Sequence, residues 1–239
     1  TRKMRPIETI RQIVWNASSN ILKHTIVIYS FNGKKHYIHC NGILFNHNQK
    51  SYIITAEHAF TNIQPGDLKI FRNGNFCFLE GTIIGHPIYD IALFELENNI
   101  ASCLSEDYVF LEKWSLLFNH RPEYKQKYLL IGYPSSKTLV NGLSIKEKPI
   151  VYHTATLKAQ PKSNEVWFSY NKRKSGKYDQ KGFFFAPNPV GLSGSGLWYV
   201  DALSLDNIQY HLVGIFKEFE GKKNTGISTK IDCLKEQIN

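Results

Sequence analysis

Two serines stand among glycines in the stretch GLSGSGLW, residues 191–198. Glycine lets the backbone turn tightly, so such a stretch can present one hydroxyl to a substrate. A serine hydroxyl is a good nucleophile only when a base accepts its proton, and that base works best when an acid orients it. Ser193 and Ser195 are therefore candidate nucleophiles, and the chain must supply a histidine and a carboxylate.

His58 and Asp90 stand out by their local context. His58 directly follows the apolar run SYIITA and opens a possible single helical turn. Asp90 in GHPIYDIALFEL begins an apolar strand, where a carboxylate will be partly buried and needs a partner. Taken singly, each of these residues is more often structural, and a Gly/Ser stretch is usually only a loop.

The elements that must position these residues are mostly strands. A helix is expected over residues 7–17, because Ile7, Ile10, Ile13 and Val14 have helical spacing. Short runs rich in Ile, Val, Phe and Tyr follow, separated by turn-forming residues. In the first half these runs are HTIVIYSF, KKHYIHCNGILFN, KSYIITA, GDLKIFRNG, NFCFLEGTIIG and DIALFEL. Strands with tight connections indicate a sandwich or a barrel.

The second half also consists of short apolar runs, but they are separated by longer loops. Residues 97–127 lack clear strand pairs and are expected to connect two domains, and residues 229–239 end the chain as a short helix. The expected strands of this half are YLLIGYP, KPIVYHTATL, EVWFSY, GSGLWYV, QYHLVGIF and TGISTKI.

Three short motifs give these residues a family resemblance. TAEH around His58, YDIAL around Asp90 and GLSGSG around Ser193 resemble the base, acid and nucleophile motifs of chymotrypsin-like (trypsin-like) serine peptidases, including those of bacteria, and they occur in the same order. Each motif alone is weak, but three in order in a strand-rich chain make a strong joint signal.

The resemblance implies a fold and a mechanism. The fold is all-β, with two six-stranded antiparallel β-barrels, a short N-terminal helix and a C-terminal helix. Residues 1–112 would carry His58 and Asp90, and residues 113–239 would carry Ser193. The backbone N–H groups of Gly191 and Ser193 would form the oxyanion hole. The reaction would be peptide hydrolysis through an acyl-enzyme, with no cofactor or metal.

Several positions differ from the animal digestive branch of this family. Ala59 replaces a cysteine that would pair with the one at Cys40, which favours a reducing compartment or a bacterial origin. Leu192 replaces the aspartate that pairs with a newly cleaved N-terminus, so activation by that ion pair is not expected. Control by loop ordering or by a partner is a hypothesis.

The sequence does not determine which peptide bonds would be cleaved. By resemblance, Pro187 lies at the floor of the primary pocket, where no acid is present to bind Lys or Arg. Ile215, Phe216 and Lys217 would form the pocket wall and bind the substrate backbone. Lys217 could select an acidic side chain. Glu218 or Glu220 could select a basic one.

Composition sets the remaining expectations. The chain of 239 residues has a formal charge of +9, four cysteines without zinc-ligand spacing, and no apolar run long enough to span a membrane. We expect a cytoplasmic protein, with secretion as the alternative, that acts on a protein or peptide. A regulatory protein or another domain is a possible partner. An α/β-hydrolase is excluded, because GLSGS lacks the final glycine of G-x-S-x-G and acid and base precede Ser193.

Two other functions remain open from the sequence. One is a binding or scaffold module that keeps the double barrel without catalysis, although no residue of the triad is replaced. The other is a nucleic-acid-associated domain that uses basic runs such as residues 171–181. No nucleic-acid-binding motif accompanies those runs, so nucleic acid is the less favoured partner.

Overall fold

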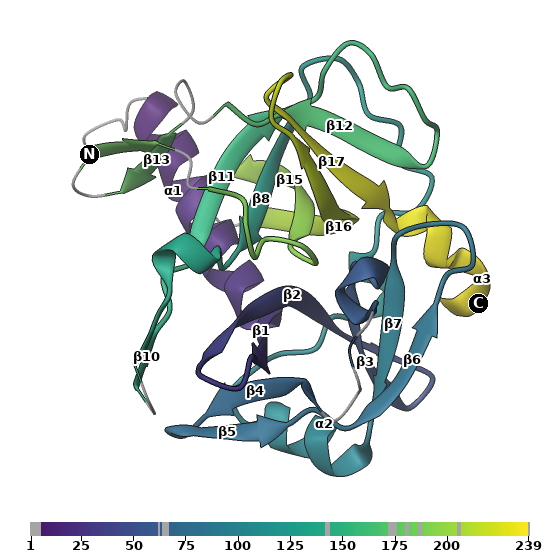
Figure 1. The fold of residues 1–239 in the computed structure, drawn as a ribbon. Coiled ribbons are helices and arrows are strands. Elements are labelled where there is room, and N and C mark those ends of the chain that lie inside the picture. The colour runs from purple at the N-terminus through teal and green to yellow at the C-terminus, as the bar shows by residue number, and fades with distance from the viewer. Residues whose placement is uncertain are drawn as a thin grey trace.

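Figure 1 shows a computed structural model of the chain, mostly β, with two curled antiparallel sheets that form half-barrels. The structure describes residues 6–61, 63, 67–141, 144–171, 176–179, 182–185, 188–204 and 207–238. The expected all-β double barrel with helices near both ends is confirmed.

The first sheet has seven strands rather than six, in the order β5-β4-β1-β2-β3-β7-β6. The run NFCFLEGTIIG divides into β5, which pairs with β4, and β6, which pairs with β7. Leu79 lies between them with its side chain buried, and its N–H donates to the carbonyl of Leu68 at 2.9 Å. The strands are β1 (Thr25–Phe31), β2 (His36–His47), β3 (Lys50–Thr55), β4 (Lys69–Arg72), β5 (Asn75–Phe78), β6 (Gly81–Gly85) and β7 (Ala92–Leu96).

The second sheet has six strands, in the order β11-β8-β15-β16-β17-β12, and each comes from one of the six expected runs. Two further hairpins, β9–β10 and β13–β14, were not expected. The strands of this half are β8 (Lys127–Gly132), β9 (Leu139–Asn141), β10 (Ser144–Lys146), β11 (Ile150–Ala155), β12 (Glu165–Ser169), β13 (Gly176–Asp179), β14 (Gly182–Phe185), β15 (Gly196–Ser204), β16 (Asn207–Glu220) and β17 (Thr225–Lys230).

The segment between the sheets touches both of them. It contains the helix α2 (Asn98–Leu104) and a 3₁₀ turn at Lys113–Ser115. Leu111 forms a parallel β-bridge with Phe45 of β2, and Leu116 forms one with Leu212 of β16. The segment is therefore anchored to each half-barrel in turn.

One apolar core is shared by the two sheets. Ile43 and Ile54 of the first sheet belong to the same buried cluster as Leu129, Trp198 and Leu212 of the second. Two other clusters lie within the individual half-barrels, one around Phe94 and one around Phe168. The shared cluster fixes the relative position of the two sheets.

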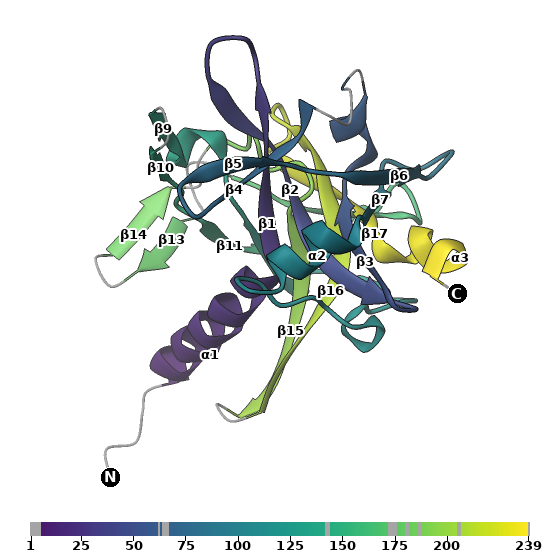
Figure 2. The same cartoon turned by 90° about the horizontal axis from the view of Figure 1, so that it is seen from below.

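Helices flank the sheets at both ends of the chain. The helix α1 (Pro6–Ile21) is longer than expected; its last turns bury Ala17 and Ile21, whereas Ile10 and Trp15 are exposed. Figure 2 shows α1 leading away from the sheets toward the N-terminus. The C-terminal α3 (Lys235–Ile238) follows a 3₁₀ turn, Ile231–Leu234. No helix within the described residues is long and apolar enough to cross a membrane.

Candidate active site

His58 and Asp90 are held together by the first half-barrel. His58 lies in a 3₁₀ turn, Glu57–Phe60, immediately after β3, and Asp90 lies just before β7, the strand paired with β3. The backbone N–H of His58 donates to Oδ1 of Asp90 at 2.9 Å. From β17 of the other sheet, the Thr229 hydroxyl donates to the carbonyl of Asp90 at 3.1 Å.

The three motif residues form a continuous hydrogen-bonded chain. Nδ1 of His58 lies 2.7 Å from Oδ2 of Asp90, and Nε2 of His58 lies 3.0 Å from Oγ of Ser193. The Asp90 contact fits a protonated Nδ1, which leaves Nε2 as the acceptor for the serine proton. The His58 side chain is 45% exposed and that of Asp90 is 26% exposed, so a substrate can reach the base while the acid is largely covered.

The electrostatics of the pair fit these roles. The hydrogen bond to Asp90 raises the pKa of His58, against the opposing effect of burial. Burial alone would raise the pKa of Asp90, but the side-chain and backbone hydrogen bonds from His58 outweigh it, so the pKa of Asp90 is lowered. Asp90 is therefore ionised at neutral pH and stabilises the imidazolium that forms when His58 takes a proton.

The loop that carries Ser193 consists of two consecutive β-turns. In the first, the N–H of Leu192 donates to the carbonyl of Pro189 at 2.9 Å; in the second, the N–H of Ser195 donates to the carbonyl of Leu192, also at 2.9 Å. The third residue of each turn is a glycine, Gly191 with φ 84° and Gly194 with φ 83°. These values are those of type II turns, which need a positive φ at that position and hence glycine. The three-residue spacing of the glycines is thus the spacing of the turns.

The turns leave two backbone N–H groups available. A β-turn uses only the N–H of its fourth residue, and among the described residues the N–H groups of Gly191 and Ser193 have no acceptor. Their directions are fixed through the carbonyls of the same planar peptides. The carbonyl of Val190 accepts from the N–H of Ser135 at 2.9 Å, and that of Leu192 closes the second turn. These are the groups predicted to form the oxyanion hole.

Asn41 of β2 fastens this loop to the first half-barrel. It is fully buried, and its backbone N–H donates to the carbonyl of Ser193 at 2.7 Å. Its side-chain amide donates to the carbonyl of Gly191 at 2.6 Å, and its side-chain oxygen accepts the N–H of Tyr133 at 2.8 Å. The sequence analysis missed Asn41. The available signal was an amide in the middle of an otherwise apolar strand, where a polar group must find partners.

Ser195, the other serine of the motif, lies away from His58. It is fully buried, and its hydroxyl has no hydrogen-bond partner among the described residues. A Cβ at Gly132 of β8 would overlap that hydroxyl, so Ser195 packs directly against the neighbouring strand. The geometry therefore associates Ser193, and not Ser195, with the histidine.

The residues predicted to bind the substrate differ in position. Ile215 and Phe216 have buried side chains, and the backbone N–H and carbonyl of Phe216 bind Ser195 and Gly194. Ile215 pairs with Gly196 of β15, and Phe216 holds the nucleophile loop, so their role in binding a substrate stays a prediction. Lys217 follows them in a bulge of β16. Pro187 lies outside the described residues.

Lys217 is engaged inside the protein. Its ammonium lies 2.7 Å from Oε1 of Glu165, a buried carboxylate that also accepts from the indole N–H of Trp167 at 2.7 Å. A lysine neutralised in this way is not free to select an acidic substrate side chain. Beyond it, Glu218 is exposed and its charge contributes to the raised pKa of His58.

The described residues offer no cluster of three or more His, Cys, Asp or Glu placed to hold a metal ion. All four cysteines are free, and burial raises the pKa of Cys40 to about 12, so its thiol is neutral. The chemistry available at the site is therefore that of the serine, the imidazole, the carboxylate and the two backbone N–H groups.

Two curled antiparallel half-barrels, packed across a shared core, define the chymotrypsin-like double-barrel fold, and this chain has that fold. Solved structures of similar shape support the assignment. A mutant of human heparin binding protein (CAP37) matches with a TM-score of 0.57 at 16% identity, covering 90% of this chain and 89% of that one.

Two further structures match over most of the chain. The protease domain of MamO from Magnetospirillum magneticum has a TM-score of 0.54 at 11% identity, covering 92% of this chain and 98% of that one. A structure from work on the Sesbania mosaic virus VPg protein has a TM-score of 0.51 at 14% identity, with 87% of both chains covered. No protein-family model matches the chain, and no curated protein is significantly similar to it. At these identities the likeness concerns the fold alone.

Proposed function

We propose that this protein is a serine endopeptidase that hydrolyses peptide bonds through an acyl-enzyme. The observation that carries the proposal is the hydrogen-bonded chain from Asp90 through His58 to Ser193, with distances of 2.7 and 3.0 Å. The order of acid, base and nucleophile, with each group in reach of the next, is the arrangement that nucleophilic serine chemistry needs.

The proposed mechanism gives each group a defined role. Nε2 of His58 takes the proton of Ser193 as Oγ attacks the peptide carbonyl carbon, and the oxyanion is bound by the N–H groups of Gly191 and Ser193. The imidazolium then gives its proton to the leaving amine, which departs and leaves an acyl-serine. Water, deprotonated by His58, hydrolyses the ester. Asp90 holds the tautomer throughout.

The proposed substrate is an extended peptide at the edge of β16. Strand β15 pairs with β16 only up to Ile215, so at Lys217 and Glu218 the described residues include no strand on that side of β16. An extended peptide can add to such an edge through main-chain hydrogen bonds. Relative to the sequence-based expectation, the substrate-binding part of the strand moves toward its C-terminal end.

The test is covalent labelling with a fluorophosphonate, which reacts with activated serines. We expect wild type to be labelled and Ser193→Ala to be inert. His58→Ala should lower turnover of a peptide substrate by roughly 10⁶, and Asp90→Ala should cost less.

Ser195→Ala is the matched control. It removes a hydroxyl that has no hydrogen-bond partner in the described part of the chain, two positions from the proposed nucleophile, and should be labelled at the wild-type rate. Loss of labelling in Ser195→Ala but not in Ser193→Ala would overturn the assignment. Absence of labelling in folded wild type would favour a binding module that keeps the fold without catalysis.

A further inference from the structure

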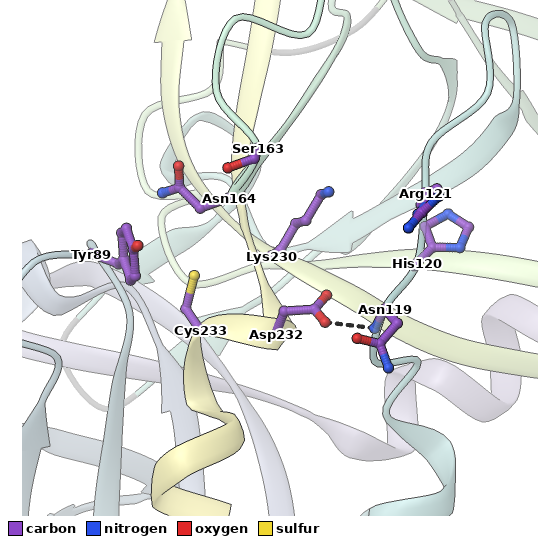
Figure 3. A pocket seen from close by; sticks show the side chains of 9 residues that line it. All are labelled: Tyr89, Asn119, His120, Arg121, Ser163, Asn164, Lys230, Asp232 and Cys233. Atoms are coloured by element: carbon purple, nitrogen blue, oxygen red, sulfur yellow. Dashed lines mark hydrogen bonds between the residues drawn. The ribbon is translucent and has the colours of Figure 1, made fainter.

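A polar cavity lies beside the triad but does not include its side chains. It has a volume of about 440 Å³, and Figure 3 shows the side chains that line it. They come from four separate segments and are Tyr89, Asn119, His120, Arg121, Ser163, Asn164, Lys230, Asp232 and Cys233. Lys230 stands in the middle, with Arg121 and His120 on one side and Tyr89 and Asn164 on the other.

The cavity holds two uncompensated positive charges. Among the described residues, neither the ammonium of Lys230 nor the guanidinium of Arg121 has a protein acceptor. The amide of Asn164 and the hydroxyl of Ser163 add neutral donors at the same place. A pair of cations flanked by neutral donors is an arrangement that binds oxyanions.

The nearby carboxylates do not cancel this charge. Oδ1 of Asp232 accepts from the N–H of Asn119 at 2.5 Å and from Lys235 at 3.2 Å, and its Oδ2 is buried away from solvent. Both oxygens of Glu165, next to Asn164 in sequence, are used by Lys217, Lys162 and Trp167. Glu123 acts on the pKa of His120 and is not among the residues that line the cavity.

The other lining groups tolerate a negative charge. Burial lowers the pKa of His120, and Lys230 lowers it further, so the imidazole is neutral; it is hydrogen-bonded to the hydroxyl of Tyr128 at 2.6 Å. Burial raises the pKa of the Cys233 thiol to about 11, so this group is uncharged as well. A bound anion would therefore meet two cations, neutral groups and the carboxylate of Asp232, which is already bound to Asn119 and Lys235.

We propose that this cavity binds a compact small molecule carrying an oxyanion of the phosphate or sulfate class between Lys230 and Arg121. Two cations that line one pocket suit a compact ligand better than a long polyanion, which would need a row of cations along a surface. The proposal does not depend on peptidase activity, because the triad side chains do not line the cavity.

The cavity shares its wall with the anchoring of Asp90. Tyr89 immediately precedes Asp90, and Lys230 immediately follows Thr229, whose hydroxyl binds the carbonyl of Asp90. The two residues joined by that hydrogen bond, Thr229 and Asp90, are thus the sequence neighbours of two residues that line the cavity.

The test is calorimetric titration of the full chain with pyrophosphate, repeated in Ser193→Ala to separate binding from catalysis. We expect both proteins to bind equally. Lys230→Gln and Arg121→Gln should each raise the Kd by about tenfold or more, because each removes a charge-assisted contact. Lys34→Gln, which removes an exposed lysine of the other half-barrel, is the matched control and should leave the Kd unchanged.

The pKa of the His120 imidazole, measured by NMR, provides an independent test of binding. A bound anion offsets the positive charge of Lys230, so pyrophosphate should raise the pKa of His120 in wild type and not in Lys230→Gln. Circular dichroism would establish that each variant is folded.

Three outcomes would overturn the proposal. The first is no heat of binding with millimolar pyrophosphate. The second is an equal loss of affinity in Lys34→Gln, which would indicate attraction by overall charge. The third is tight binding of a sulfated oligosaccharide or single-stranded nucleic acid with none of pyrophosphate, which would indicate an extended polyanion surface instead.

Discussion

Asn41 uses all four of its polar groups at the junction of the half-barrels. Its carbonyl accepts from the Thr55 hydroxyl at 2.7 Å, and its other groups bind Ser193, Gly191 and Tyr133. By holding the carbonyls of Gly191 and Ser193, Asn41 keeps both turns of the nucleophile loop in place. Asn41 is a positioning residue in the proposed reaction, since it acts through the loop.

Asn41→Ala should therefore impair both stability and reaction rate. The carbonyl of Gly191 and the N–H of Tyr133 would lose their partner, at about 1–3 kcal/mol each in free energy of unfolding. Misplacement of the loop should slow fluorophosphonate labelling by roughly 10²-fold, the effect of losing one oxyanion donor. Denaturant unfolding and labelling rates measure the two effects.

Asn46→Ala is the control for that experiment. Asn46 is on the same strand and its side chain accepts only from Ser51, so this change should leave labelling unaffected. If Asn41→Ala lost stability but was labelled at the wild-type rate once folded, Asn41 would have a structural role alone.

The His58–Asp90 pair predicts the pH dependence of the reaction. Only neutral His58 can accept the serine proton, so labelling should decline as pH falls below the raised pKa of His58. Asp90→Asn removes the cause of that shift, so the decline should move to lower pH while the maximal rate falls by roughly 10⁴. A pH profile of labelling checks both effects, and an unmoved profile would contradict the assignment.

The same pair stabilises the fold over a defined pH range. Because the pKa of His58 is raised, its contribution is complete below its ordinary pKa of about 6.5 and is lost as pH rises through the folded value. Because the pKa of Asp90 is lowered, its contribution is present above its ordinary pKa of about 3.9 and is lost as pH falls through the folded value. The pair is thus most favourable between those limits.

At the scale of elements, most strands could be predicted, because each is a short run of closely spaced apolar residues in the sequence. All six runs of the second half became strands of one sheet, and His58 and Asp90 follow and precede the paired strands β3 and β7. The apolar pattern of NFCFLEGTIIG predicts one strand. Its first part pairs with β4 and its second part with β7, and sequence alone does not reveal this change of partner.

What escaped prediction depends on contacts between distant segments. Lys217 donates a hydrogen bond to Glu165, and Asn41 donates one to Gly191; both bonds join residues far apart in the chain. Ile215 and Phe216 were assigned to the substrate because they lie on the expected strand. The pairing of Ile215 with β15 and the bonds of Phe216 to the loop follow from the register of β16, which the apolar pattern leaves open.

At the scale of the whole molecule, the shared core makes each half-barrel depend on the other. The second half alone contributes nine buried residues to that cluster, among them Leu116, Leu129, Ile131, Trp198, Leu212 and Ile215. Burying each such side chain is worth about 1.5–3 kcal/mol, so six of them match the whole stability of a typical domain, about 5–15 kcal/mol.

We therefore expect residues 1–112 and 113–239, expressed separately, to lack stable tertiary structure, although each half has a cluster of its own. The intact chain should unfold in one transition. Near-ultraviolet circular dichroism and amide NMR spectra of the halves, together with denaturant unfolding of the whole, provide the measurement. A half that folded alone would mark an independent domain and contradict the expectation.

The hydrogen bonds that fasten the nucleophile loop bear on how the chain tolerates mutation. Ser135, Phe216 and the turns hold the loop through main-chain atoms, which survive any replacement of side chains except by proline. Among the described residues, the amide of Asn41 is the one side-chain donor to the loop's carbonyls. Sequence drift at most surrounding positions would thus leave the loop's shape intact, which fits a fold retained at 11–16% identity. A substitution at Asn41 would remove this side-chain bond to Gly191, while the backbone N–H at that position would still hold the carbonyl of Ser193.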